Sequence, residues 1–236
     1  MKKIKNIKYV FFDLYNTLVK FHPDREDTQV YAAKSVNFKV AKDQMKKALL
    51  KADSWFASET AFKSVHLLNK REKFNFFCNY EKEIMKNLNI DISEEQAMKM
   101  WQYVRDEKSS LVIYEDVIDC FKFLVKEKYI IGIITNIDSS GVALLNELKL
   151  SRYVNKVITS KDANASKPDP KIFTFALEKF NAKASDCLFI GDQIETDVKG
   201  ALKIGMIPIL IDRNHEFHAF DKYLKIFNLK QLELYL

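Results

Sequence analysis

Residues 9–18 read YVFFDLYNTL, and this stretch decides the fold class. Its first four residues, Tyr9–Phe12, form a continuous apolar run, which predicts a short strand buried on both faces of a sheet. The run stops at Asp13, so a carboxylate stands where the strand should end. Later apolar runs of the same kind cover residues 129–134, 156–158, 187–190 and 206–211.

Helical patterns separate these later runs. One is expected over residues 116–127 and another over Pro170–Phe180, where Asp169 is a good N-cap and Pro170 suits the first turn. Short apolar strands that alternate with amphipathic helices predict parallel βαβ units, with helices on both faces of the sheet. The sequence therefore predicts an α/β core with a doubly wound parallel sheet.

A block of helical patterns interrupts this series after its first strand. It contains no glycine, and Ser93 with Gln96 forms a capping box at the start of one of its helices. We therefore place the core at residues 1–18 and 112–236, and an inserted all-helical domain at 19–111. The aromatic residues of the insert are expected to form mainly its core. They are Trp55, Phe56, Phe62, Phe74, Phe76, Phe77, Tyr80 and Trp101.

The composition excludes several classes of protein. The 5 glycines form neither a G-x-G-x-x-G loop nor a Walker loop, which excludes a glycine-rich nucleotide cradle. The 38 Lys and Arg residues outnumber the 32 Asp and Glu residues, but they are scattered, so no nucleic-acid partner is expected. The 3 cysteines lie far apart, which argues against a disulfide framework or a zinc ribbon.

No apolar run approaches the roughly 18 residues of a membrane span. We therefore expect a cytoplasmic protein with no membrane partner. Nothing in the sequence indicates the oligomeric state.

Polar side chains follow the predicted strands at the points where they end. The carboxyl ends of parallel strands meet at one edge of a sheet and form its ligand crevice, so a functional site is expected there. The residues at these ends are Asp13, Thr135, Ser160 with Lys161, Asp192 and Asp212.

Four segments resemble the motifs of the haloacid dehalogenase (HAD) superfamily and occur in that superfamily's order. FFDLYNTL at 11–18 looks like motif I, IITN at 133–136 is similar to motif II, and KPDP at 167–170 resembles motif III. GDQIETD at 191–197, followed by Gly-Ala, resembles motif IV in its phosphatase form. The resemblance implies a Rossmann-like core, with the helical insert as a small cap of the C1 type.

The resemblance also implies catalytic and substrate-binding roles. Asp13 would be the nucleophile that forms an aspartyl-phosphate, because a carboxylate held on a rigid strand can attack a phosphoryl group. Thr17, Thr135 and the backbone N–H of Asn136 would bind the phosphoryl oxygens. Lys167 would neutralise the charge shared by the nucleophile and the substrate.

A metal site is implied by the same motifs. Asp13, Asp192, Asp197 and the backbone carbonyl of Tyr15 would hold Mg²⁺, either directly or through water. Oxygen ligands and few dedicated protein groups suit this ion, which keeps several of its waters. The implied partner is a small phosphorylated substrate, and the implied cofactor is Mg²⁺.

Tyr15 departs from the phosphatase pattern and leaves alternatives open. Phosphatases of the superfamily have there a second Asp as the catalytic acid and base, whereas a tyrosine, with a pKa of about 10, suits this role poorly near pH 7. The 2-haloacid dehalogenases carry Tyr there, but they lack acidic residues at Asp192 and Asp197 and use an arginine early in the cap. No arginine occurs between Arg25 and Arg71. We therefore expect a Mg²⁺-dependent phosphatase, with a dehalogenase or an impaired binder of a phosphorylated ligand as alternatives.

Overall fold

The computed structural model describes residues 3–60, 65–137, 140–215, 217 and 222–236. The chain divides into two compact units, Met1–Lys20 with Val112–Leu236, and Phe21–Leu111. The first boundary lies two residues later than expected from the sequence. Strands β2 (Val19–His22) and β3 (Ser110–Ile113) pair where the chain passes from one unit to the other and back.

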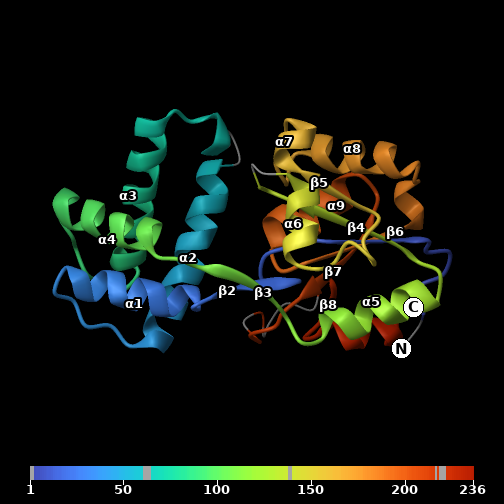
Figure 1. Ribbon diagram of the computed structural model, residues 1–236, viewed down its shortest axis with the longest axis horizontal. Helices are drawn as coiled ribbons and strands as arrows, with labels where there is room; N and C mark the ends of the chain where they lie inside the picture. Colours follow the sequence, from blue (N-terminus) through green and yellow to red (C-terminus); the bar gives the residue numbers. More distant parts are fainter. Residues whose placement is uncertain (1–2, 61–64, 138–139, 216, 218–221) are drawn as a thin grey trace. The chain divides into compact units, whose positions relative to one another are not determined.

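The first unit is built on a six-stranded parallel sheet (Figure 1). Its strands lie in the order β5-β4-β1-β6-β7-β8, so the chain runs from central β1 to one edge and then crosses to the other. This change of direction makes the sheet doubly wound and places a crevice at the carboxyl end of β1. The strands are β1 (Tyr9–Phe12), β4 (Ile130–Thr135), β5 (Lys156–Thr159), β6 (Cys187–Gly191), β7 (Ile207–Ile211) and β8 (Leu224–Ile226).

Helices cover both faces of this sheet (Figure 1). Phe11 of β1 packs with Phe173 and Phe189 on the face that carries α8 and α9. The next residue, Phe12, points to the opposite face, where its ring centroid lies 5.3 Å from that of Phe121 in α5. Successive side chains of a strand alternate in this way, so β1 is buried on both sides as its sequence predicts.

The helices of this unit begin close to the predicted positions. Helix α8 starts at Pro170, and Oδ1 of Asp169 accepts a hydrogen bond from the Lys171 N–H at 2.9 Å, which confirms the predicted N-cap. The helices are α5 (Val117–Lys126), α6 (Gly141–Glu147), α7 (Ser160–Ala163), α8 (Pro170–Phe180) and α9 (Lys199–Lys203), with the 3-10 helices η2 (Ala184–Asp186) and η4 (Leu229–Leu234) and the π-helix η3 (Ile194–Val198).

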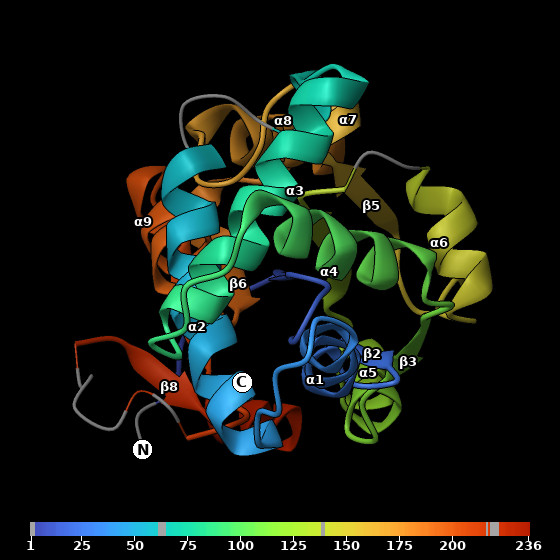
Figure 2. The same cartoon turned by 90° about the vertical axis from the view of Figure 1, so that its left-hand side faces the viewer.

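The second unit is built of helices between its two ends (Figure 2), but strands β2 and β3 reach into those ends, so the insert expected at 19–111 is not entirely helical. Ser93 accepts from the Gln96 N–H while the Gln96 side chain accepts from the Ser93 N–H, which confirms the capping box. The helices are α1 (Arg25–Ser35), α2 (Lys42–Thr60), η1 (Val65–Leu67), α3 (Lys70–Lys86) and α4 (Glu94–Asp106).

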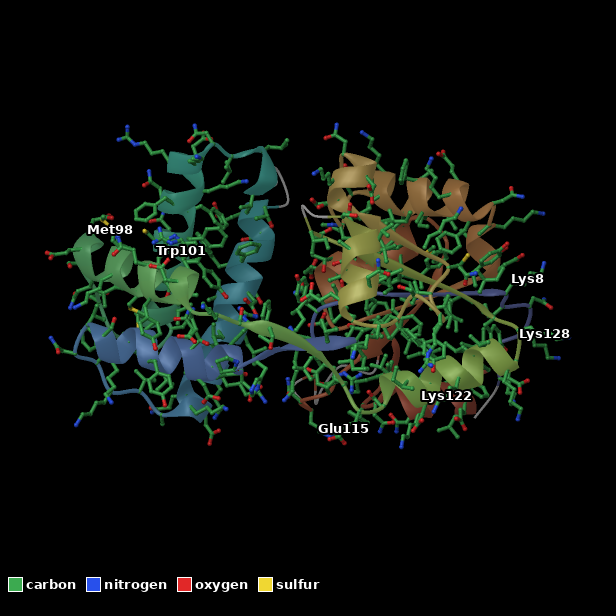
Figure 3. The ribbon with its side chains drawn as sticks, viewed as in Figure 1. Lys8, Met98, Trp101, Glu115, Lys122 and Lys128 are labelled. Atoms are coloured by element: carbon green, nitrogen blue, oxygen red, sulfur yellow. The ribbon has the colours of Figure 1, made fainter. Side chains whose placement is uncertain are left out.

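The fully buried centre of this unit is aliphatic and sulfur-containing, with Met45, Ile84 and Met100 among its side chains. The aromatic residues flank that centre. Trp101 (Figure 3) stacks on Phe77 with ring centroids 4.2 Å apart, and both are half-buried. Phe62 lies outside the described residues. Most of the aromatic set therefore lies at the border of the core.

The cysteines are buried and free, which confirms that they form no disulfide framework. Two of the scattered lysines, Lys8 and Lys122 (Figure 3), lie on different segments of the chain. Lys8 lies beside Asp186, and Lys122 lies beside Asp119. Among the described helices, none is both long and apolar enough to cross a membrane.

An acidic side chain is buried among the helices of the second unit. Glu81 is 0% exposed, and its Oε1 accepts from Nε2 of Gln29 at 3.0 Å. Its Oε2 and the Oε1 of Gln29 lack partners within the described residues. Burial raises the pKa of Glu81 from 4.5 to about 7, although the Gln29 hydrogen bond opposes the shift. Protonation would turn one Glu81 oxygen from an acceptor into a hydrogen-bond donor.

We expect Glu81→Gln to remove a pH dependence of stability. Between pH 4.5 and 7 the folded protein binds more protons than the unfolded chain at Glu81, so the wild type loses stability as the pH rises through this window. The loss is on the order of 3 kcal/mol, since each pH unit contributes up to 1.36 kcal/mol. Urea unfolding at pH 4.5 and pH 8 measures it. The variant should gain stability relative to the wild type at pH 8, unlike the exposed control Glu95→Gln; equal differences at both pH values would contradict the assignment.

Candidate active site

Asp13 is held at the centre of the sheet edge. It directly follows β1, and its N–H donates to the carbonyl of Ile190 in the neighbouring strand β6 at 2.8 Å. The chain then turns sharply: the N–H groups of Leu18 and Val19 both donate to the carbonyl of Leu14, at 2.8 and 3.0 Å. Asn16 adopts a left-handed φ of 57°, which Asn tolerates better than most residues. The buried Asp13 carboxylate is thus fixed by a strand on one side and a tight turn on the other.

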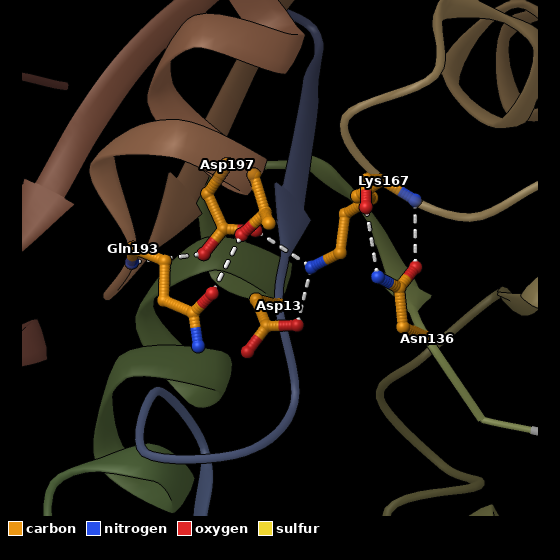
Figure 4. A network of polar contacts seen from close by, with 6 residues as sticks. Asp13, Asn136, Lys167, Gln193 and Asp197 are labelled. Carbon is orange, nitrogen blue, oxygen red and sulfur yellow. Dashed lines mark hydrogen bonds and ion pairs between the residues drawn. The ribbon is translucent and has the colours of Figure 1, made fainter. Parts of the chain in front are cut away.

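Lys167 joins two carboxylates of the site (Figure 4). Its Nζ lies 2.5 Å from Oδ1 of Asp13 and 2.7 Å from Oδ1 of Asp197. Burial lowers the pKa of Lys167, but the charges and hydrogen bonds of Asp13 and Asp197 outweigh it, so its net pKa is raised and the ammonium stays charged. The two predicted site residues Asp13 and Lys167 are therefore in direct contact.

Asn136 holds the backbone of Lys167 in place (Figure 4). Its Nδ2 donates to the Lys167 carbonyl at 3.0 Å, and its Oδ1 accepts from the Lys167 N–H at 2.7 Å. The sequence suggested a phosphate-binding role for the Asn136 N–H, and the side-chain contact with Lys167 is an additional one. It ties the end of β4 to the segment that precedes α8.

Asp197 lies on the π-helix η3, close against the end of β6. Its Oδ2 accepts from the N–H of Gln193 at 3.0 Å, so both of its oxygens are held by protein donors. A Cβ on Gly191 would lie 2.4 Å from the Asp197 carboxylate, so only glycine permits this close approach. π-helices are rare and frequently occur at functional sites.

Asp192 completes a group of three carboxylates with Asp13 and Asp197. One oxygen from each lies within 4.8 Å of the others. Burial is the main cause that raises the pKa of Asp13, to about 6, and that of Asp192; mutual repulsion within the group adds to both. Lys167 opposes the shift at both residues, and a side-chain hydrogen bond from Asn16 opposes it at Asp192. Clustered carboxylates of this kind are a donor set that fits a divalent cation.

The fold, the four motifs and this cluster agree with a match to a family model. The model for haloacid dehalogenase-like hydrolases matches residues 7–205. The chain belongs to this family of hydrolases. The matched stretch includes Lys167 and all three carboxylates of the cluster, Asp13, Asp192 and Asp197.

Relatives of this HAD-like hydrolase include named phosphatases. The chain is 32% identical to a ribulose-1,5-bisphosphate 5-phosphatase of Halopiger xanaduensis, over 49% of this chain and 48% of the relative. It is 26% identical to a glyceraldehyde 3-phosphate phosphatase of Pyrococcus furiosus, over 86% of this chain and 80% of the relative. The chain spans less than half the length of several curated relatives that it matches at 30% identity or more.

Solved structures support the fold of the HAD-like hydrolase. A crystal structure of a HAD phosphatase from Thermococcus onnurineus aligns over 97% of both chains with a TM-score of 0.55 and 24% sequence identity. A likeness at this identity concerns the fold alone.

Two buried hydroxyls of the HAD-like hydrolase are unpartnered. Thr17 and Thr135 are both 0% exposed, and their Oγ1 atoms have no hydrogen-bond partner within the described residues. Such groups usually have a partner in folded proteins, and an exception calls for an explanation such as a ligand or a water. Both had been predicted from the sequence as substrate-binding residues.

Tyr15 is half-buried beside the cluster. Burial raises the pKa of its hydroxyl, and the charges of Asp13 and Glu147 raise it further. The phenol therefore stays protonated at neutral pH, which suits neither a general base nor a ready proton donor.

The expectation that site residues follow the strand ends, here called the strand-end rule, led to the charged cluster. It also included residues that have other partners. Ser160 donates to the carbonyl of Ile137 at 2.8 Å, and Lys161 is exposed. Asp212 is buried and accepts from the N–H of Phe217 at 3.0 Å. Asn16 was missed as a partner of Asp192, although its place in the turn after the first strand was a usable signal.

Proposed function

We propose that the chain is a Mg²⁺-dependent phosphatase that hydrolyses small phosphate monoesters through an aspartyl-phosphate at Asp13. The observation that carries the proposal is the Lys167 ammonium between Asp13 and Asp197, with Asp192 beside them. This arrangement presents a carboxylate nucleophile next to a fixed positive charge. The names of the relatives are consistent with small phosphorylated substrates.

The metal site would use the carboxylates of Asp13 and Asp192, with Asp197 and the backbone carbonyl of Tyr15. All are hard oxygen donors, which Mg²⁺ prefers. Because Asp197 already accepts from Lys167 and Gln193, its role fits contact through water better than direct ligation. Bound Mg²⁺ would offset the negative charges of the nucleophile and the phosphoryl group, which must approach each other.

The reaction would proceed in two steps at the phosphorus atom. An oxygen of Asp13 forms a bond to phosphorus while the bond from phosphorus to the ester oxygen breaks, and the leaving alkoxide takes a proton from water. Water then attacks the phosphorus of the aspartyl-phosphate and releases a proton to the solvent, which balances the proton that the alkoxide took up. The bond to Asp13 breaks, inorganic phosphate leaves, and the carboxylate is restored.

The remaining residues would bind and orient the phosphoryl group. Thr17 and Thr135 have buried hydroxyls that can donate to phosphoryl oxygens, and Lys167 can follow the charge as it moves from Asp13 to phosphate. Groups placed in advance around a developing charge lower the barrier without reorganising during the reaction. Asn136 would support this indirectly, because it fixes the backbone of Lys167.

Removal of the metal provides the first test. We expect phosphate release from a panel that includes glyceraldehyde 3-phosphate and phosphoglycolate, measured with Mg²⁺ and after treatment with EDTA. Activity should fall by about 10²-fold or more with EDTA, since metal stabilisation amounts to several kcal/mol. Added Mg²⁺ should restore it. Full activity in EDTA would contradict the proposed metal dependence.

Tyr15 favours one alternative, hydrolysis of a short 2-haloacid, because a halide leaves without a proton. Halide release from 2-chloropropionate without a metal would support that alternative. Ligand-induced stabilisation by phosphoesters with no hydrolysis would instead indicate a binding protein. The intact acidic residues Asp192 and Asp197 favour the phosphatase.

A further inference from the structure

A largely buried arginine outside the carboxylate cluster contacts the turn that carries Asp13. Arg213 follows strand β7, and its side chain is 11% exposed. Its Nε and Nη2 donate to the backbone carbonyl of Thr17, at 3.2 and 2.7 Å. Thr17 lies four residues after Asp13, so one side chain holds the turn through two donors at a single carbonyl.

Arg213 is itself fixed by its neighbours. Its Nη1 and Nη2 donate to the two carboxylate oxygens of Asp116, at 2.9 and 3.0 Å. Its guanidinium carbon lies 3.9 Å from the centroid of the Tyr114 ring. A planar guanidinium that is paired with a carboxylate and stacked on a ring has little freedom left, so its contact with Thr17 is set in advance.

The Asp116 carboxylate binds Arg213 and does not cap its own helix, α5. Asp116 occupies the N-cap position of α5, yet its side chain makes no capping hydrogen bond. Its Oδ2 also accepts from the N–H of Leu229, at 2.7 Å. The Asp116 carboxylate therefore joins Arg213 to the C-terminal segment of the α/β unit.

The turn links Thr17 to the carboxylate cluster. The N–H of Asn16 donates to the carbonyl of Val19 at 2.7 Å, and the N–H of Leu18 donates to the carbonyl of Leu14 at 2.8 Å. Because the turn is internally bonded, a displacement at Thr17 would also shift Asn16 and Asp13. Arg213 thus lies at the far end of a continuous path that ends at Asp13, one of the three carboxylates.

We propose that Arg213 is a positioning residue that fixes residues 13–19 in the geometry required at Asp13. It acts through the carbonyl of Thr17, with Asp116 as its anchor. The expected effect on catalysis rests on the proposed phosphatase function. The expected effect on the turn does not depend on it.

Hydrogen–deuterium exchange of the full chain tests the effect on the turn. Lysine keeps the charge of Arg213 but cannot make its planar set of bonds to Thr17 and Asp116 together. In Arg213→Lys the amides of residues 14–19 should exchange about tenfold faster, whereas those of strand β4 should be unchanged. An unchanged rate at 14–19 in the folded variant would overturn the proposal.

A matched control is available in the helical unit. Arg25 makes a similar two-bond pair with Asp53, at 2.9 and 3.0 Å, and contacts the Tyr80 hydroxyl. Arg25→Lys removes a comparable ion pair but should leave exchange at 14–19 as in the wild type. If it accelerates exchange there as much as Arg213→Lys does, the effect is global and the proposal is overturned.

Asp116→Asn keeps the test decisive even where Arg213→Lys folds poorly. Asparagine retains an acceptor but loses the charge that orients Arg213, so exchange at 14–19 should also rise. The double variant should exchange no faster than the faster single variant, because both act through the same contact. If the double variant instead showed the product of the two single increases in exchange rate, the two residues would not act through one contact, and the shared path would be overturned.

Activity separates positioning from a structural role. In Arg213→Lys, kcat should fall about tenfold to a hundredfold while KM stays within about twofold, because misplacement of the nucleophile affects the chemical step. Faster exchange with an unchanged kcat would overturn the catalytic part. If the wild type hydrolyses no phosphoester, the proposed function fails, and the exchange data still decide the role of Arg213 in the turn.

Discussion

Asp13→Asn should reduce phosphate release by at least about 10⁴-fold, the largest loss we expect from a single substitution. An amide of the same shape cannot attack phosphorus, so the covalent step is lost. The fold should persist, because the N–H of residue 13 still donates to Ile190 and Lys167 keeps its contact with Asp197. Phosphate release at saturating substrate, together with thermal unfolding, measures both effects.

The control for this substitution is Asp169→Asn. Asp169 is exposed and caps helix α8, and Asn is an equally good N-cap, so neither stability nor activity should change much. If Asp13→Asn retained wild-type activity, Asp13 could not be the nucleophile and the mechanism would be wrong.

Tyr15→Asp should raise Mg²⁺-dependent phosphatase activity by about 10²–10⁴-fold, which is the range that a well-placed general acid and base contributes. The phenol cannot serve because burial and the charges of Asp13 and Glu147 raise its pKa above its ordinary value of 10.0. A carboxyl group at this position could protonate the leaving oxygen and then activate water. Initial rates of phosphate release from the preferred substrate provide the measurement.

Tyr15→Asn tests whether the increase comes from acid–base chemistry or only from the smaller size of the new side chain. Asn has nearly the shape of Asp but no titratable proton, so it should give little of the increase. If Tyr15→Asp instead leaves the activity unchanged or lowers it, Tyr15 belongs to the native mechanism and the dehalogenase alternative gains support.

The sheet could be predicted from the sequence because its strands are continuous apolar runs. Tyr9–Phe12 forms β1 with the predicted bounds, and Pro170–Phe180 forms α8 behind the predicted cap. The short strands β2, β3 and β8 were missed. In β2 and β8 apolar residues alternate with Lys or His, and the apolar residues 111–113 of β3 directly follow the helical block, so the pairing of these strands depends on where the rest of the chain brings them.

The candidate site was predictable where it depends on strand ends and motifs. Asp13, Asp192, Asp197 and Lys167 were all predicted, and the structure brings them together. Contacts between side chain and backbone were not predictable, because they depend on the packing of segments distant in the sequence. The hydrogen bond from the Asn136 side chain to the Lys167 carbonyl, for example, joins residues 31 positions apart.

Arg213 shows how narrowly the strand-end rule can miss a residue. The rule selected Asp212 at the end of β7, whereas the next residue reaches the turn after Asp13, 196 positions away. A single charged residue after a strand has many ordinary roles. Only the observed contacts with Thr17 and Asp116 distinguish this one.

The most direct test of the account is to trap the covalent intermediate. The wild-type protein is mixed with a ³²P-labelled substrate and Mg²⁺, quenched with acid within the first turnover, digested and analysed by mass spectrometry. We predict label on the peptide that contains Asp13, none in Asp13→Asn, and none in wild type treated with EDTA. Rapid phosphate release from wild type with no label on that peptide, under conditions that preserve acyl phosphates, would contradict an aspartyl-phosphate at Asp13.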